Sequence, residues 1–262
     1  PPCSAVSSAP PKARPMPPRN PDRSDLPRVS WDEFTRRLGW RQGEHLSAIG
    51  PTGTGKTTAV LELLQARSAR SPKWHTVVLA TKPKDATLSA LLRRPEWSKV
   101  TTWPPHDFDR SVILWPDWRD PITSNAHQRR VFQAAFSHIF AAGSWAVFAD
   151  ELSYLSRELR MDSWLRSFWQ QGRSLKLTLV GATQRPAWVP LDVYSAPTHL
   201  MFWRTGDDAD LRRISGIGGL PSKLIRSGVT SLDARANEFL YVNSRTGAIC
   251  VSRAEQKATR PR

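Results

Sequence analysis

Residues 46–58 read LSAIGPTGTGKTT, and this stretch decides the fold. The residues before Gly50 have the composition of a short buried strand, and the glycine-rich turn leads into the first turn of a helix. The phosphate-binding pattern G-x-x-x-x-G-K-[ST] is matched by Gly50, Gly55, Lys56 and Thr57. The sequence therefore predicts a P-loop at this point.

Each residue type in this loop has a physical role in binding phosphate. Glycines let the backbone curl so that successive N–H groups point inward, and the following helix directs its positive end to the same place. Lys56 supplies a point charge for the β- and γ-phosphates, and the Thr57 hydroxyl is a ligand for Mg²⁺. We expect ATP to contact the whole loop, namely Gly50, Pro51, Thr52, Gly53, Thr54, Gly55, Lys56, Thr57 and Thr58.

Residues 145–151 read WAVFADE, an apolar strand that ends in two carboxylates. Downstream of a P-loop, this pattern is typical of a Walker B motif. Asp150 at the strand tip is predicted to hold Mg²⁺ through its water shell, and Glu151 to orient and deprotonate the attacking water. The adjacent glutamate favours hydrolysis over kinase chemistry, because a kinase does not need to activate water.

Residues 175–181 read LKLTLVG and predict a further central strand, which leads to Gln184. An amide beside the Walker B strand can contact the γ-phosphate or the lytic water, and so report whether ATP or ADP is bound. The alternative is an ordinary hydrogen-bonding loop amide. Earlier in the chain, residues 76–80 form another apolar strand, followed by Lys82 and Lys84, which face either a ligand or solvent.

Composition limits the class of protein. The chain has 262 residues, which suits one α/β domain with tails, and a net charge of +15, which suggests a polyanionic partner such as nucleic acid. A cationic surface without a specific ligand is the alternative. Two cysteines and six scattered histidines form no disulfide or zinc pattern, and no apolar run is long enough for a membrane span. We therefore expect a cytoplasmic protein of a bacterium, or of a phage or mobile element acting in its host's cytoplasm.

The chain divides into three parts by composition. Residues 1–28 form a basic lead-in rich in proline and arginine, predicted to be disordered and available to a protein partner. Residues 29–252 form one ATPase domain, and residues 253–262 a basic tail. Within the domain, residues 95–121 are rich in tryptophan and proline, and we expect an irregular segment with one strand over 112–115. Its tryptophans are interpreted as local core or a subunit contact, with base stacking as the alternative.

Helix-capping patterns place two further helices. Ser30 is predicted to cap a short helix, and Ser124 and Asn125 to cap a long amphipathic helix that ends before Gly143. The end of the chain, over residues 238–251, has the alternation of a closing hairpin.

The order of these motifs resembles that of the FtsK–HerA superfamily of P-loop motors. The run 171–174 (QGRS), an apolar strand and then 182–186 (ATQRP) look like the third motif of that family. Residues 199–204 (HLMFWR) resemble its next strand, and residues 207–214 (DDADLRRI) its following helix. The similarity covers most of the chain, from about residue 44 to about residue 220.

The resemblance implies an α/β P-loop NTPase fold of the additional-strand, catalytic-glutamate (RecA-like) type. Its central sheet is mostly parallel with helices on both faces, and the P-loop and Walker B strands flank the sensor strand. The resemblance also implies a sensor role for Gln184 and, for Arg173, a contact with the nucleotide of the neighbouring subunit. Arg185 and Arg204 are the next candidates for that contact, and any of the three arginines can instead pair with a carboxylate.

The predicted function is ATP hydrolysis coupled to DNA translocation or packaging by a homo-oligomeric ring, with a hexamer as the expected state. Contacts to the DNA backbone make such binding tolerant of sequence and sensitive to salt. One alternative is an ATPase that powers protein export or virion assembly without DNA. Another is a regulatory nucleotide-binding module with little turnover. The compact motor core favours the packaging or mobile-element branch over the cell-division branch.

Overall fold

The computed structural model describes residues 26–254 except 72, 106–110 and 218. The strands of this part of the chain are β1 (Leu46–Ile49), β2 (His75–Leu79), β3 (Ser98–Val100), β4 (Ser111–Leu114), β5 (Trp145–Ala149), β6 (Thr178–Thr183), β7 (His199–Trp203), β8 (Glu238–Asn243) and β9 (Ile249–Arg253). The helices are α1 (Trp31–Arg37), α2 (Lys56–Arg70), α3 (Ala86–Leu91), α4 (Pro121–Ala142), α5 (Asp162–Gln171), α6 (Asp192–Ser195), α7 (Asp208–Ser215) and α8 (Ser222–Ser231).

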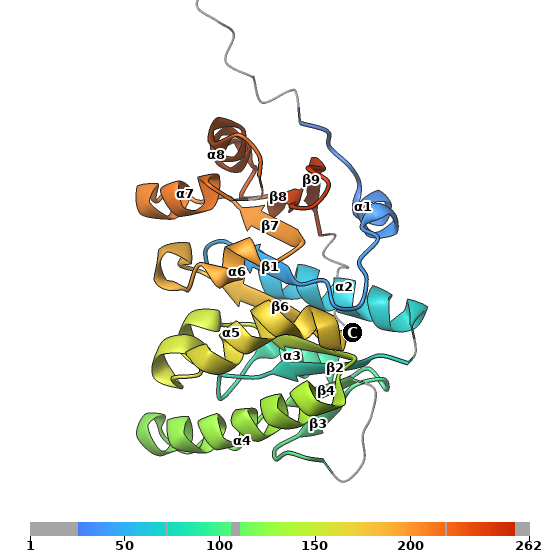
Figure 1. Ribbon diagram of the computed structural model, residues 1–262, viewed down its shortest axis with the longest axis vertical. Coiled ribbons are helices and arrows are strands. Elements are labelled where there is room, and N and C mark those ends of the chain that lie inside the picture. The colour runs from blue at the N-terminus through green and yellow to red at the C-terminus, as the bar shows by residue number, and fades with distance from the viewer. Residues whose placement is uncertain (1–25, 72, 106–110, 218, 255–262) are drawn as a thin grey trace, which may run out of the picture.

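All strands of the described residues join one sheet in the order β3-β4-β2-β5-β6-β1-β7-β8-β9 (Figure 1). The strands from β3 to β7 pair in parallel, whereas β8 and β9 pair antiparallel at one end. Strand β6, which leads to the predicted sensor Gln184, lies between β5, which leads to the predicted Walker B carboxylates, and β1, which leads to the predicted P-loop, so this part of the predicted strand order is confirmed. Since parallel strands end at the same edge, the three motifs leave the sheet side by side.

Helices cover both faces of the sheet, as expected for a parallel sheet made of continuous apolar runs. Successive residues of β5 alternate between the two faces. Val147 packs into a core shared with α4, α5, α7 and α8, whereas Phe148 packs into a second core shared with α1, α2 and α3. In Figure 1, α5 crosses in front of the sheet and α2 lies behind it. The predicted α/β architecture is therefore confirmed.

Two element boundaries differ from the sequence prediction. The predicted cap at Ser124 and Asn125 is wrong: α4 begins at Pro121, and the Asp120 carboxylate accepts the N–H groups of Ile122 and Thr123, both at 2.9 Å. An aspartate followed by proline is the stronger start signal. The predicted strand from residue 175 starts later, at Thr178, because a short helical turn and a left-handed residue precede it.

The segment rich in tryptophan and proline contains two strands, β3 and β4, rather than one. Trp97, Trp103 and Trp115 are buried, in agreement with the interpretation as local core, whereas Trp118 is exposed. Residues 106–110 of this segment lie outside the described residues, as do residues 1–25 and the end of the basic tail. At the end of the predicted lead-in, Pro27 already accepts a hydrogen bond from the Val251 N–H (2.8 Å).

Ser30 caps α1 as predicted, with its hydroxyl accepting from the Glu33 N–H at 3.2 Å. The closing hairpin is also present, as β8 and β9. None of the described helices has both the length and the hydropathy to cross a bilayer.

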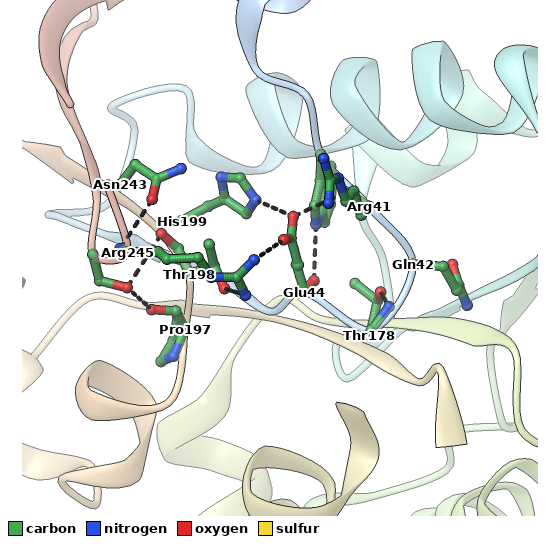
Figure 2. A network of polar contacts seen from close by, with 12 residues as sticks. Arg41, Gln42, Glu44, Thr178, Pro197, Thr198, His199, Asn243 and Arg245 are labelled. Carbon is green, nitrogen blue, oxygen red and sulfur yellow. Dashed lines mark hydrogen bonds and ion pairs between the residues drawn. The ribbon is translucent and has the colours of Figure 1, made fainter. Parts of the chain in front are cut away.

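An ionic network in which Glu44 and His199 are buried and Arg245 is exposed ties the sheet together at the edge opposite the P-loop (Figure 2). The Glu44 carboxylate, just before β1, accepts from the Arg41 N–H (3.0 Å), from His199 Nε2 at the start of β7 (3.1 Å) and from Arg245 in the β8–β9 turn (2.8 Å). Tyr241 contacts the other ring nitrogen of His199 at 2.8 Å. Burial alone raises the pKa of Glu44, but these hydrogen bonds and the charges of His199 and Arg245 outweigh it and lower the pKa to about 2.

We expect Glu44→Gln to lower the free energy of unfolding by about 3 kcal/mol at neutral pH, since it removes one partner of a buried charge network. The folded-state pKa lies below the ordinary value of 4.5. The contribution of Glu44 is therefore complete above pH 4.5 and falls as the pH drops toward 2. Urea unfolding between pH 7 and pH 3 measures this. The difference between wild type and variant should shrink with acid, and Glu96→Gln, which changes an exposed carboxylate, should show neither effect.

Candidate nucleotide-binding site

The P-loop curls at the carboxyl end of β1 because its glycines permit it. The Gly50 N–H donates to the Thr183 carbonyl of β6 at 3.1 Å. A Cβ at Gly50 would lie 2.5 Å from Cβ of Trp203, so only glycine fits there. Gly55 has a φ of 84°, in the left-handed region that glycine adopts without strain, and the next residue starts α2. The loop thus presents the amino end of α2 to the sheet edge.

Beside the loop lies a cavity of about 280 Å³. Its lining residues are Thr52, Gly53, Gly55, Lys56, Thr57, Thr58, Lys82, Asp85, Thr87, Asp150, Glu151 and Gln184. Three predicted contacts, Gly50, Pro51 and Thr54, are not in this lining. They shape the loop instead, since the Pro51 carbonyl accepts from Thr54 Oγ1 (2.8 Å) and from Lys56 Nζ (2.7 Å).

Lys56 places a cation at the wall of the cavity. Burial lowers its pKa to about 8, while Asp150 and Glu151 oppose this shift and Lys82 adds to it. The amine therefore remains largely protonated at neutral pH. Its hydrogen bond to Pro51 uses one of the three ammonium donors, which leaves two for a phosphate group.

Thr57 and Asp150 form an oxygen pair suited to Mg²⁺. The Thr57 hydroxyl donates to Asp150 Oδ1 at 2.6 Å, across the gap between α2 and the tip of β5. Burial raises the pKa of Asp150, and the Thr57 hydrogen bond and the charges of Lys82 and Lys56 offset this in part. A divalent cation would stabilise the ionised carboxylate further, and hard oxygen ligands are those that Mg²⁺ prefers. The residues present therefore fit the metal.

Three motifs meet through one hydrogen-bonded chain. The Glu151 carboxylate accepts from Gln184 Nε2 (2.6 Å) and from Ser153 Oγ (2.7 Å). The Gln184 carbonyl oxygen accepts in turn from the Thr52 hydroxyl of the P-loop. The predicted sensor thus contacts both the predicted base and the phosphate loop, an arrangement that can pass a change at the nucleotide to Glu151.

Lys82, Asp85 and Thr87 complete the cavity wall after β2. The Lys82 ammonium lies 3.9 Å from both the Asp85 and the Asp150 carboxylates and lines the cavity, while half of its side-chain surface is exposed to solvent. Asp85 caps α3 by accepting from the Leu88 N–H at 3.0 Å. Sequence reasoning missed Asp85 and Thr87. Their position just after a parallel strand was the signal that could have found them.

The three candidate arginines lie in different places. Arg173 is exposed in the short turn Gly172–Leu175, at the edge of the sheet opposite the P-loop. Arg185 is held by Asp207 (3.2 Å) and Asp210 (3.7 Å). Arg204 is exposed after β7 and donates to the Leu232 carbonyl at 3.3 Å. In the part of the chain that the structure describes, no arginine lines the cavity.

Comparison with known proteins supports the fold. No family model matches the sequence, and no curated protein resembles it at a significant level. Among solved structures, the chain is similar to the DNA-packaging ATPase B204 from Sulfolobus turreted icosahedral virus, with a TM-score of 0.58 and 15% identity over 81% of this chain and 98% of that one. The genome-packaging NTPase B204 of Sulfolobus turreted icosahedral virus 2 in complex with AMPPCP gives a TM-score of 0.56 and 15% identity over 79% and 96% of the two chains.

The fold is also similar to the cytoplasmic domain of the type VII secretion ATPase EccC from Thermomonospora curvata. The TM-score is 0.52 with 16% identity, over 82% of this chain and 25% of that one. The chain therefore has the fold of these ATPases, which agrees with the fold that the resemblance to the FtsK–HerA motors implied.

Proposed function

We propose that this protein is an ATP-hydrolysing motor that couples turnover to translocation or packaging of DNA as a homo-oligomeric ring. The observation that carries the proposal is the convergence of Lys56, the Thr57–Asp150 pair and the Glu151–Gln184 pair on one cavity at the carboxyl edge of the sheet. A site that only stored nucleotide would not need a carboxylate positioned to activate water.

In the proposed mechanism each side chain has one task. The loop N–H groups and the Lys56 ammonium bind the β- and γ-phosphates of ATP. Thr57 and Asp150 hold Mg²⁺, which when bound offsets the negative charge of the phosphates. Glu151 orients a water molecule and accepts its proton. Gln184 contacts the γ-phosphate and also donates a hydrogen bond to Glu151. Departure of the phosphate therefore changes the hydrogen bond between Gln184 and Glu151.

A ring would supply the arginine that the described lining of the cavity lacks. Arginines that stabilise a departing γ-phosphate commonly come from another subunit. Arg173 is exposed at the opposite edge of the sheet, where it can face a neighbour's nucleotide. Arg185 already has two carboxylate partners, so it is less available. We therefore propose Arg173 as the residue acting in trans and a hexamer as the assembly.

DNA is the proposed partner on the basis of charge and of the fold. The net charge of +15 suits a phosphate backbone, and two similar structures are named as genome-packaging enzymes of viruses. We propose that the motor works in the cytoplasm of a bacterium or of the host of a phage or mobile element. The proline-rich lead-in, most of which lies outside the described residues, is proposed as a site for a protein partner.

The second candidate function is an ATPase that powers protein export or virion assembly without moving DNA. The observation that favours it is the similarity in fold to a secretion ATPase. The catalytic residues would have the same tasks, so only the polymer that stimulates turnover separates the two candidates.

The experiment that tests the proposal is steady-state ATP hydrolysis with and without linear duplex DNA at low and moderate salt. We expect several-fold stimulation that weakens as salt rises, because backbone contacts depend on counterion release. Lys56→Ala should lower turnover by at least about a hundredfold, as the loss of one charged donor to the reacting phosphate does. Lys223→Ala removes an exposed lysine of α8 and should match wild type. Hydrolysis that is indifferent to DNA at both salt concentrations would contradict the proposal and favour the export candidate.

A further inference from the structure

A tryptophan stacked with two arginines lies at the surface beside the sensor. Trp188 ends the short helical turn Pro186–Trp188 that follows β6, and half of its surface is exposed. The guanidinium carbon of Arg157 lies over the Trp188 ring, 4.9 Å from its centroid, and that of Arg185 lies 5.2 Å from it. An exposed tryptophan alone needs no explanation, but here two cations lie over its ring.

The two arginines differ in what their donors do. Arg185 is held by Asp207 and Asp210, and the Asp210 carboxylate also accepts from the Ala187 N–H at 3.2 Å. Arg157 is exposed, and within the described residues its guanidinium makes no ion pair or hydrogen bond. Stacking on an aromatic ring orients the guanidinium plane while leaving its in-plane N–H groups available. Arg157 is therefore an exposed cation held over the Trp188 ring, with donors that are not used within the described residues.

The stack is connected to the predicted catalytic pair through both of its arginines. Arg157 belongs to the π-helical turn Tyr154–Glu158, which follows Glu151 closely in the chain, and single π turns are frequent at functional sites. Arg185 directly follows Gln184, and Gln184 donates to Glu151 at 2.6 Å. A shift of Glu151 relative to Gln184 would thus move the segment that carries Arg157 relative to the segment that carries Trp188.

We infer that Arg157 and Trp188 form a contact for the phosphate backbone of DNA whose geometry depends on the bound nucleotide. The inference rests on the proposed function and names the part of the chain that grips the polymer. Phosphate is the ligand that matches an oriented guanidinium with free parallel N–H groups, since it accepts them in a bidentate manner. Trp188 acts as a positioning residue that holds the Arg157 plane.

The test is the binding of fluorescein-labelled linear duplex DNA to the full chain, followed by anisotropy with AMPPCP and with ADP over a range of salt. We expect Arg157→Ala to weaken binding about tenfold with AMPPCP, as loss of a charge-assisted contact does, and to reduce the salt slope by about one. Trp188→Ala, which changes no charge, should weaken binding about threefold through the lost stacking. Trp188→Phe keeps an aromatic face and should stay within about twofold of wild type. The affinity of the wild type for DNA should differ between AMPPCP and ADP. The affinity of Arg157→Ala for DNA should be equally low with both nucleotides.

Two controls separate the outcomes. Arg129→Ala removes the same charge from the exposed face of α4 and should stay close to wild type, and thermal unfolding checks that every variant is folded. If the wild type binds DNA but Arg157→Ala and Trp188→Ala bind it equally well, the inference fails while the proposed function stands. If the wild type does not bind DNA at any salt concentration, both fail. A partner protein whose binding is lost in both variants while DNA binding is unchanged would assign the stack to a protein interface and overturn the inference.

Discussion

Replacing Glu151 with glutamine is expected to slow ATP hydrolysis by about a thousandfold while leaving the affinity for ATP nearly unchanged. Glutamine has the same shape, so it can keep one of the hydrogen bonds that Ser153 and Gln184 now make to the carboxylate. It cannot accept a proton from water. Lys56 and Thr57, which are predicted to bind the phosphates and the metal, are untouched.

The measurement pairs single-turnover hydrolysis with calorimetric titration of ATP. Glu158→Gln is the matched control, since it makes the same change at an exposed glutamate outside the cavity. A Glu151→Gln variant that turns over ATP at a rate near that of wild type would contradict the assignment of the base. It would favour the third possibility raised by the sequence, a regulatory nucleotide-binding module with little turnover.

Replacing Arg173 with alanine is expected to lower turnover in the assembled protein by about a thousandfold or more, the range found for arginines that act across an interface. Arg173 lies at the opposite edge of the sheet from the cavity of its own subunit. Its loss should therefore leave ATP binding to an isolated subunit intact. Turnover is measured at protein concentrations above and below assembly, which sedimentation defines.

Mixing two inactive variants tests whether Arg173 acts in trans. A subunit with Arg173→Ala keeps its Glu151, and a neighbour with Glu151→Gln keeps its Arg173, so the interface between them contains one complete site. We expect the mixture to recover a measurable fraction of wild-type activity. Arg204→Ala, at the other exposed candidate, is the comparison. If Arg204→Ala is slow and Arg173→Ala is not, the trans contact belongs to Arg204.

Much of the fold follows from local signals. The P-loop pattern, the acidic strand end at Asp150 and the apolar run before Gln184 each reflect a constraint that acts over a few residues. They are therefore readable from the sequence. The position of β6 between β5 and β1 followed from the resemblance, and the meeting of their loops followed from the rule that parallel strands share one functional edge. The cavity wall contributed by Asp85 and Thr87 was missed because their proximity to Asp150 depends on β2 pairing with β5.

What remained unpredictable depends on contacts between distant residues. The Glu44 network joins the starts of β1 and β7 with the turn after β8. No pattern of residue spacing in the sequence predicts these contacts. The stack of Arg157 on Trp188 joins segments after β5 and β6 in the same way. The wrong cap at Ser124 has a different origin. The Ser124 hydroxyl accepts hydrogen bonds from the N–H groups of Arg119 and Asp120. Serine is a favoured capping residue, but here its side chain stabilises the turn that precedes the helix.

The most direct test of the central claim is displacement of a third-strand oligonucleotide bound to linear duplex DNA, followed by fluorescence as the protein hydrolyses ATP. A motor that moves along DNA should remove the third strand with ATP but not with AMPPCP, and the delay should grow with the distance between the loading end and the triplex. Glu151→Gln should bind the duplex without displacing the strand. ATP hydrolysis that proceeds at its full DNA-stimulated rate while the third strand stays in place would contradict translocation.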